Sequence, residues 1–265
     1  MKKNSTPDER AKGRAGWFAR MGLKDALARG GCPLCQALGT SLRRYLFSFL
    51  YEGMMSCIAR EEFLKGGGFC QQHFWQAKWI EEECWADGFG ISILCENLIS
   101  RSLKDLEVWT QSGKTLKTGF LRFRKPAKKR GGGFNLIPGN RCIACVILRS
   151  SEEHYLGALE DRLEEPDFAD RYNDSPGLCL RHLQTAAERW QLPAALELVK
   201  VRAQHVLHEL LAELREFQRK HDYQYKHEPR GSEWSSPERT IDFLVGPRAD
   251  LTGFKELQPT RRTRR

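Results

Sequence analysis

The chain has 265 residues, of which 40% are apolar, and it carries a formal net charge of +9 at pH 7. This length allows one large or two small domains with buried cores. The apolar runs are far shorter than the roughly 18 residues of a membrane span, so no membrane-spanning segment is expected. The charged N-terminus lacks the apolar stretch of a secretion signal, and a cytoplasmic location is therefore predicted.

The positive charge is concentrated in three segments of the chain. Residues 1–31, 113–130 and 261–265 carry +5, +8 and +4, which leaves −8 for all other residues. The folded parts are therefore expected to be acidic and to lack a basic groove. The basic connector could still bind nucleic acid through the phosphates, without strong sequence preference.

Apolar residues recur at helical spacing along most of the chain, and no segment shows the alternation of a strand. We predict an all-α protein, a duplicated helical zinc-binding repeat with two pseudo-equivalent halves and a C-terminal helix. The predicted segments are a disordered N-terminus (1–22), a first repeat (23–112), a basic flexible linker (113–140), a second repeat (141–228), a C-terminal helix segment (229–246) and a disordered basic tail (247–265).

Each repeat is predicted to contain several helices in a similar order. In the first repeat the helices are expected at 23–29, 36–51 and 54–65, then from His73, with a long helix after Gly88. In the second repeat they are expected at 146–163, 167–172 and 181–190, with a long helix from Pro193 to about Phe217. Gly66, Gly67 and Gly68 end the third helix and allow a left-handed turn before the next motif.

The most informative feature is a pair of cysteine and histidine tetrads in the same order. The first tetrad consists of Cys32, Cys35, Cys70 and His73, and the second consists of Cys142, Cys145, Cys179 and His182. Each half contains a CxxC pair, then 34 or 33 intervening residues, then a CxxH pair preceded by a glycine and one apolar residue. Because the pattern occurs twice in register, it indicates an internal duplication.

Three thiolates and one imidazole form a closed tetrahedral Zn²⁺ site, which is typical of a structural metal. We expect the CxxC pair of each half to join the CxxH pair of the same half. A helix would carry the chain out and a second helix would return it, with both pairs near helix N-termini, where the helix dipole favours thiolates. An iron–sulfur cluster is the less favoured alternative for these ligands.

The remaining candidates are weaker. Cys57, Cys84 and Cys95 are expected to be small buried residues, and His205 and His208 to be ordinary surface or core histidines. Glu52 and Asp161 lie 18 residues before Cys70 and Cys179. Either could accept a hydrogen bond from a ligand histidine, although we favour solvent-exposed positions. No catalytic or cofactor-binding constellation is evident, so catalysis is the less expected role.

The quoted motifs resemble those of an uncharacterised bacterial family, known only as a domain of unknown function. The resemblance is carried by Cys32-Pro33-Leu34-Cys35, Tyr51-Glu52, Gly68-Phe69-Cys70 with His73, and their counterparts in the second half. The closing segment from Trp234 to Gly246 is also similar. The chain departs from the family pattern in lacking proline after Cys142 and in its long basic connector. The resemblance implies a duplicated metal-binding protein and supplies no activity.

These observations favour a zinc-binding protein with two structural sites that acts as a macromolecular interaction module, with an unidentified protein as its partner. The first alternative is nucleic-acid binding through the basic linker and tails. The second alternative is a metal-dependent enzyme or a redox protein, which would require one tetrad to leave a coordination position open.

Overall fold

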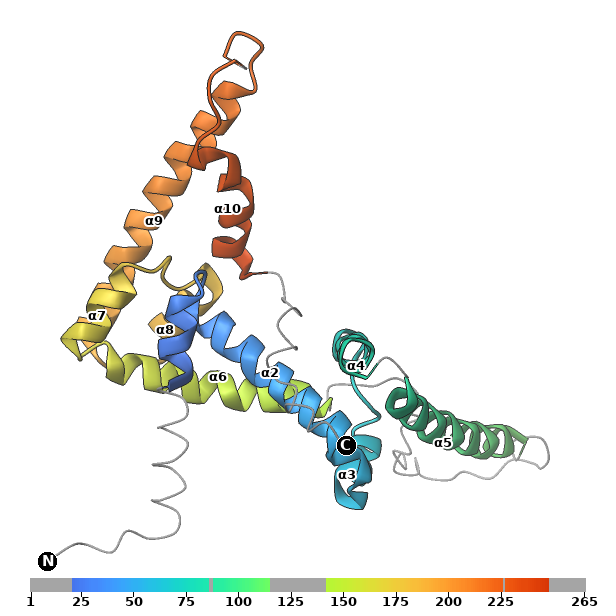
Figure 1. The fold of residues 1–265 in the computed structure, drawn as a ribbon. Helices are drawn as coiled ribbons and strands as arrows, with labels where there is room; N and C mark the ends of the chain where they lie inside the picture. Colours follow the sequence, from blue (N-terminus) through green and yellow to red (C-terminus); the bar gives the residue numbers. More distant parts are fainter. Residues whose placement is uncertain (1–20, 86–87, 115–141, 226, 248–265) are drawn as a thin grey trace, which may run out of the picture. The chain divides into compact units, whose positions relative to one another are not determined.

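The computed structural model describes residues 21–85, 88–114, 142–225 and 227–247. Every regular element in these ranges is a helix (Figure 1), which confirms the all-α prediction. None of these helices is long and apolar enough to cross a membrane. Most of the N-terminal segment, the basic linker and the tail predicted at 1–22, 113–140 and 247–265 lie outside the described residues.

The helices follow the order predicted from the apolar spacing. A short helix covers residues 21–28. The further elements of the first half are α2 (Pro33–Tyr51), η1 (Gly53–Met55), α3 (Cys57–Lys65), α4 (Gln71–Cys84) and α5 (Phe89–Lys114). Those of the second half are α6 (Ile143–Arg162), α7 (Pro166–Asn173), α8 (Leu180–Arg189), α9 (Pro193–Lys220), η2 (Ser232–Ser235) and α10 (Ser236–Val245).

The described residues form two compact units that do not coincide with the sequence halves. Those up to residue 41 and from 148 onward belong to unit 1, and those from 42 to 147 belong to unit 2. Helices α2 and α6 each contribute residues to both units. Unit 1 therefore contains the CxxC motif of the first half, and unit 2 contains the CxxC motif of the second half.

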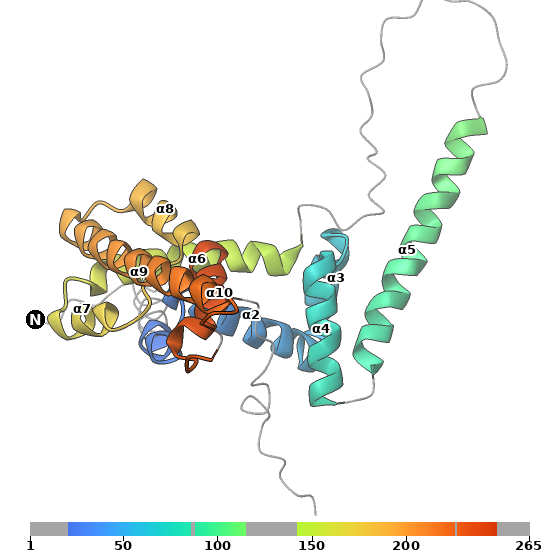
Figure 2. The ribbon, with the colours of Figure 1, turned by 90° about the horizontal axis from the view of Figure 1, so that it is seen from above.

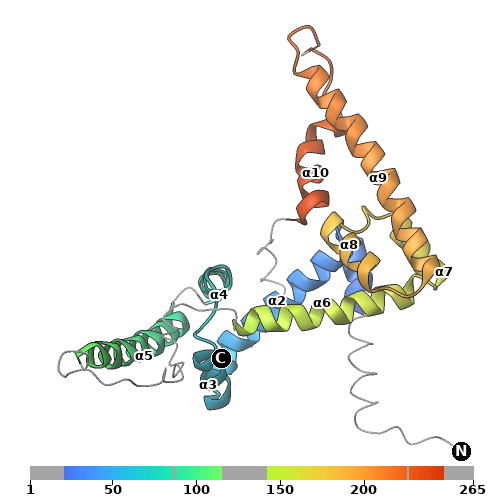
Figure 3. The ribbon, with the colours of Figure 1, turned by 180° about the vertical axis from the view of Figure 1, so that it is seen from behind.

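The core of unit 1 is built around the second half of the chain. Its largest fully buried side chains are Leu23, Leu34, Leu159, Tyr172, Leu178 and Val199. Both η2 and α10 pack against α9, and α10 lies alongside part of that helix (Figures 1 and 3). Phe243 of α10 packs against Ala203, Val206 and Leu210, which belong to the apolar stripe of α9.

The core of unit 2 contains a cluster of aromatic rings. Phe49, Phe63, Phe69 and Phe74 lie with neighbouring ring centroids 5.0–6.4 Å apart, mostly edge to face. Such contacts stabilise a core beyond simple area burial. Helices α4 and α5 pack against each other in this unit (Figure 2).

A glycine with positive φ precedes each CxxH motif. Gly68 has φ 90° and Gly177 has φ 75°, a region that side-chain-bearing residues rarely adopt. A Cβ atom on Gly68 would also lie 2.9 Å from Leu98 Cδ1. The chain then continues through a fully buried residue, Phe69 or Leu178, into the ligand cysteine. The turn at Gly67 and Gly68 confirms the left-handed step predicted for the first half, and the turn at Gly177 shows the same step in the second half. Both turns anchor a CxxH motif to the core.

Candidate metal centres

Each of the four cysteine motifs lies at the N-terminus of a helix, as predicted. Helices α2, α4, α6 and α8 begin one residue after Cys32, Cys70, Cys142 and Cys179. In all four, the carbonyl of that cysteine accepts the first helical hydrogen bond, at 2.8–3.1 Å. The second ligand follows three residues later, so one helical turn presents both ligands from the same end. The positive end of the helix dipole favours thiolates there.

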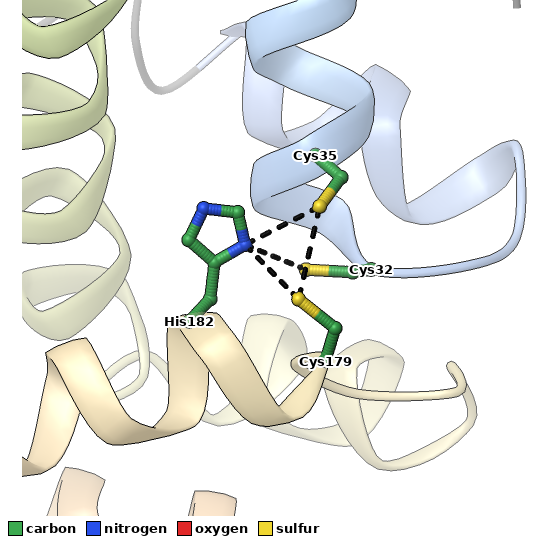
Figure 4. Close-up of side chains that lie close together, drawn as sticks. All are labelled: Cys32, Cys35, Cys179 and His182. Atoms are coloured by element: carbon green, nitrogen blue, oxygen red, sulfur yellow. Dashed lines mark hydrogen bonds between the residues drawn. The ribbon is translucent and has the colours of Figure 1, made fainter. Parts of the chain in front are cut away.

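The first centre combines Cys32 and Cys35 from α2 with Cys179 and His182 from α8 (Figure 4). The three sulfur atoms lie 3.3–3.4 Å from His182 Nδ1, and the Cys35 and Cys179 sulfurs are 3.8 Å apart. Three of the four residues are buried, and Cys35 is partly exposed. All four residues belong to unit 1.

The second centre combines Cys70 and His73 with Cys142 and Cys145. The sulfur atoms lie 3.2–3.4 Å from His73 Nδ1, and the Cys70 and Cys145 sulfurs are 3.8 Å apart. Cys142 and His73 are buried, while the other two are partly exposed. All four residues belong to unit 2.

The structure therefore brings the eight predicted residues together, but the predicted grouping is wrong. Each CxxC pair meets the CxxH pair of the other half. Helix lengths explain the error. Helix α2 has 19 residues but α3 only 9, and α6 has 20 residues but α7 only 8. At ~1.5 Å per residue, a return of ~12–14 Å cannot reverse ~29–30 Å, so neither CxxH pair returns to its own CxxC pair.

The dimensions of both clusters fit one tetrahedral ion. With Zn–S near 2.3 Å and Zn–N near 2.0–2.1 Å, the edges of a tetrahedron are ~3.8 Å between sulfurs and ~3.5 Å between sulfur and nitrogen. The observed contacts of 3.8 Å and 3.2–3.4 Å are close to these values. All four ligand atoms of each cluster lie within 4.8 Å of one another. The donor sets are thus able to enclose a single metal ion.

Hydrogen bonding and burial shift the pKa values of several residues in the two clusters. In the first centre, hydrogen bonds from Cys32 and Cys35 lower the pKa of Cys179, and the bond to Cys179 raises the pKa of Cys35. In the second centre, burial lowers the pKa of His73, while burial and then the neighbouring Cys142 raise that of Cys145 to about 12. Binding of a cation at either centre would displace the protons that these groups share.

Two residues near the first centre were not predicted from the sequence. Glu152 of α6 lies 3.1 Å from His182 Nε2, and its carboxylate also accepts a hydrogen bond from Arg181 at 2.7 Å. Gly246, at the end of α10, approaches Cys35 so closely that a Cβ atom would lie 3.1 Å from its sulfur. Nothing in the helical pattern of the sequence distinguishes Glu152 from the neighbouring Glu153, which is exposed. Gly246 closes the segment predicted as a C-terminal helix, but nothing in the sequence places that segment beside Cys35.

The other candidates of the sequence analysis lie away from the centres. Glu52 and Asp161 are exposed, as favoured. His205 is exposed beside Glu209, 3.5 Å away. The expectation that the three remaining cysteines are buried is wrong, because Cys57 is exposed and Cys84 and Cys95 are partly exposed. Cys57 is the first residue of α3, in which Phe63 is the buried residue.

The sequence matches the Family of unknown function (DUF6062) over residues 19–250. The chain belongs to this family. The match includes all eight ligand residues and α10, and it confirms the resemblance noted from the motifs. Among curated proteins and solved structures, none matches the chain.

Proposed function

We propose that this member of the family is a zinc protein with two structural Cys₃His sites that serves as a macromolecular interaction module. The observation that carries the proposal is the geometry of the eight ligands, which form two sets of four at the spacing of a tetrahedron. Four protein ligands per ion leave no coordination position for water or substrate, which supports a structural role over a catalytic one.

The ligand spacing favours a single zinc ion over an iron–sulfur cluster. In a cluster, different iron atoms take different thiolates, so the sulfur ligands surround a larger object than one ion. Here the contacts of 3.2–3.8 Å in each set leave room for one atom at the centre. A Cys₃His donor set is also common among structural zinc sites.

The exposed surface of unit 1 supports the role as an interaction module. Helices α9 and α10 carry exposed apolar side chains, among them Leu207, Leu211, Ile241, Leu244 and Val245. Leu207 and Leu211 are four residues apart on α9, and Ile241 is three and four residues before Leu244 and Val245 on α10, so each helix presents neighbouring apolar side chains. Contiguous exposed apolar surface of this kind is typical of contacts with other proteins. We therefore infer that the zinc centres hold a scaffold whose helices bind a protein partner.

Metal analysis of the purified full-length chain tests the zinc proposal. We expect close to two zinc ions per chain by mass spectrometry under native conditions, and loss of helical structure when a chelator removes them. Retention of a cooperative fold without metal would contradict the proposal. Detection of iron together with visible absorption would indicate an iron centre in place of the proposed zinc sites.

Nucleic-acid binding is the second candidate because residues 113–130 carry +8 without any acidic residue. Fluorescence anisotropy with a labelled DNA duplex should then show affinity that falls steeply with salt, independent of sequence. Deletion of residues 114–130 should abolish this binding and leave the zinc content unchanged. Unchanged affinity after the deletion would exclude the basic linker as the binding segment.

A further inference from the structure

A cavity of about 330 Å³ lies in unit 2, away from the metal ligands. It is bordered by the end of α2, by η1 and α3, and by the adjoining ends of α4 and α5. Its walls are mainly apolar and include Leu50, Met54, Trp85 and Ile93. Two charged residues, Arg60 and Glu81, also line it. Pockets for small ligands typically combine an apolar wall with a few polar groups in this way.

The charge of Glu81 is already satisfied by the protein. This side chain is buried, and its carboxylate accepts hydrogen bonds from Gly90 N–H and, at 2.9 Å, from Ile91 N–H. Both donors lie in the first turn of α5, where the helix dipole favours an anion. Glu81 therefore holds α4 to α5 and forms part of the fixed wall of the cavity.

Arg60 is in the opposite situation. Its Nε atom is buried and has no hydrogen-bond partner among the described residues. The guanidinium contacts only the weak acceptor Cys57 Sγ, at 3.7 Å from Nη2, in the part of the chain that the structure describes. A buried donor without an acceptor is costly, and more so when it carries charge. The half-buried Arg60 side chain thus offers the cavity a cation that has no anionic partner among the described residues.

The aromatic wall beside this cation is held in place by ring contacts. The Trp85 ring stacks on Phe47 and on Tyr51, with centroids 5.2 Å and 6.1 Å away. A fixed apolar wall reduces the entropy that a ligand loses on binding. A cavity of ~150 Å³ accommodates one benzene ring, so this volume suits a ring with a short alkyl chain.

We propose that this cavity binds a small apolar carboxylate. The carboxylate group accepts hydrogen bonds from the Arg60 guanidinium, a pairing that is favoured by charge and by planar geometry. The apolar part of the ligand lies against Leu50, Met54 and Ile93, beside Trp85. The proposal does not depend on the identity of the metal or on the proposed interaction role.

Paired probes test the proposal on the full-length, metal-loaded protein. We expect 4-butylbenzoate to bind, as measured by calorimetry, and the uncharged 4-butylbenzamide to bind about tenfold or more weakly. The two probes have the same apolar part, so the difference reports the interaction with the cation. Equal binding of the two probes, or no binding of the acid at millimolar concentration, would overturn the proposal.

Variants locate the interaction. Arg60→Met should reduce the affinity for the acid to that for the amide. Arg44 is an exposed arginine of α2 outside the cavity, so Arg44→Met should leave the affinity for both probes unchanged. Ile93→Phe should weaken the binding of both probes because the larger side chain fills part of the cavity. Metal content and circular dichroism of each variant establish that it is folded. Acid binding unchanged in both Arg60→Met and Ile93→Phe would place the ligand elsewhere.

Discussion

At the scale of single residues, the crossed pairing of the ligands gives a direct test. Cys70→Ser should release one metal ion and destabilise the protein by more than about 4 kcal/mol. Because Cys70 shares its centre with Cys142 and Cys145, those two thiols should become open to alkylation while Cys32 and Cys35 stay protected. Mass spectrometry of the alkylated peptides measures this. Labelling of Cys32 and Cys35 instead would indicate pairing within each half.

Glu152 should strengthen metal binding at the first centre only. Its carboxylate, 3.1 Å from His182 Nε2, orients the ring and makes the other nitrogen a better ligand. We expect Glu152→Gln to weaken one of the two metal sites about 10–100-fold in a competition titration with a chelator. Glu153→Gln is the matched control, since Glu153, the next residue on α6, pairs with Arg189 instead. An equal effect of both variants would refute this role.

Gly90 is required at the start of α5, where this helix packs against Glu81. A Cβ atom at this position would lie 2.5 Å from Glu81 Oε1 and 2.7 Å from Met54 Sδ. Gly90→Ala should therefore destabilise the protein by about 1–3 kcal/mol in a denaturant titration. Gly157→Ala in α6, where a Cβ atom meets nothing within 4 Å, should be neutral or stabilising by up to about 1 kcal/mol. Similar losses in both variants would contradict this packing argument.

At the scale of helices, the sequence predicts the elements but not how their ends meet. The apolar stripe from Leu196 to Phe217 predicts α9, and Pro193 begins that helix as expected. The pairing of Cys32 with His182 joins residues 150 apart and leaves no trace in local spacing. The pairing depends on the lengths of α3 and α7, the helices that follow α2 and α6. A difference of a few residues in a helix boundary changes where each CxxH motif lies.

The same limit applies to the groups around the centres. Glu152 of α6 lies beside His182 of α8 only in the folded chain, and its sequence neighbourhood, a pair of glutamates followed by His154, does not point to this contact. The cavity beside Arg60 is bordered by helix ends from four elements and η1, so it too follows from tertiary packing. The eight cysteine and histidine residues that the structure brings together stand out in the sequence because one helical turn fixes the spacing within each motif.

The contact between α9 and η2 should make stability depend on pH. Glu233 is buried beside Lys220, 2.8 Å away, and Gly231 N–H also donates to it. Lys220, then Gly231, lowers the pKa of Glu233 from 4.5 to about 2. The stabilisation that this ion pair gives to the folded state is therefore present above about pH 4.5 and is lost as the pH falls toward 2.

Glu233→Gln should remove this part of the pH dependence. Acid also releases metal from both proteins, so the difference in melting temperature between the wild type and the variant isolates the effect. We expect that difference to be largest at neutral pH and to shrink below about pH 4.5. A difference that stays constant down to pH 3 would show that the ion pair does not contribute.

At the scale of the whole molecule, neither half of the sequence contains a complete centre. Each half supplies one CxxC pair to one unit and one CxxH pair to the other. Contacts between residues 69–150 apart close both centres, and contacts of such long range slow folding. A metal ion bound at each centre would therefore connect the two halves as well as stabilise each unit.

Cleavage between the halves tests this consequence. One protease site inserted within residues 115–141 would yield two fragments, each with half of the ligands of both centres. We expect the fragments to co-elute in gel filtration with two metal ions per pair. A chelator should separate or unfold them, because each ion is held by ligands from both fragments. Fragments that separate without a chelator, each retaining one ion, would show that each tetrad closes within its own half.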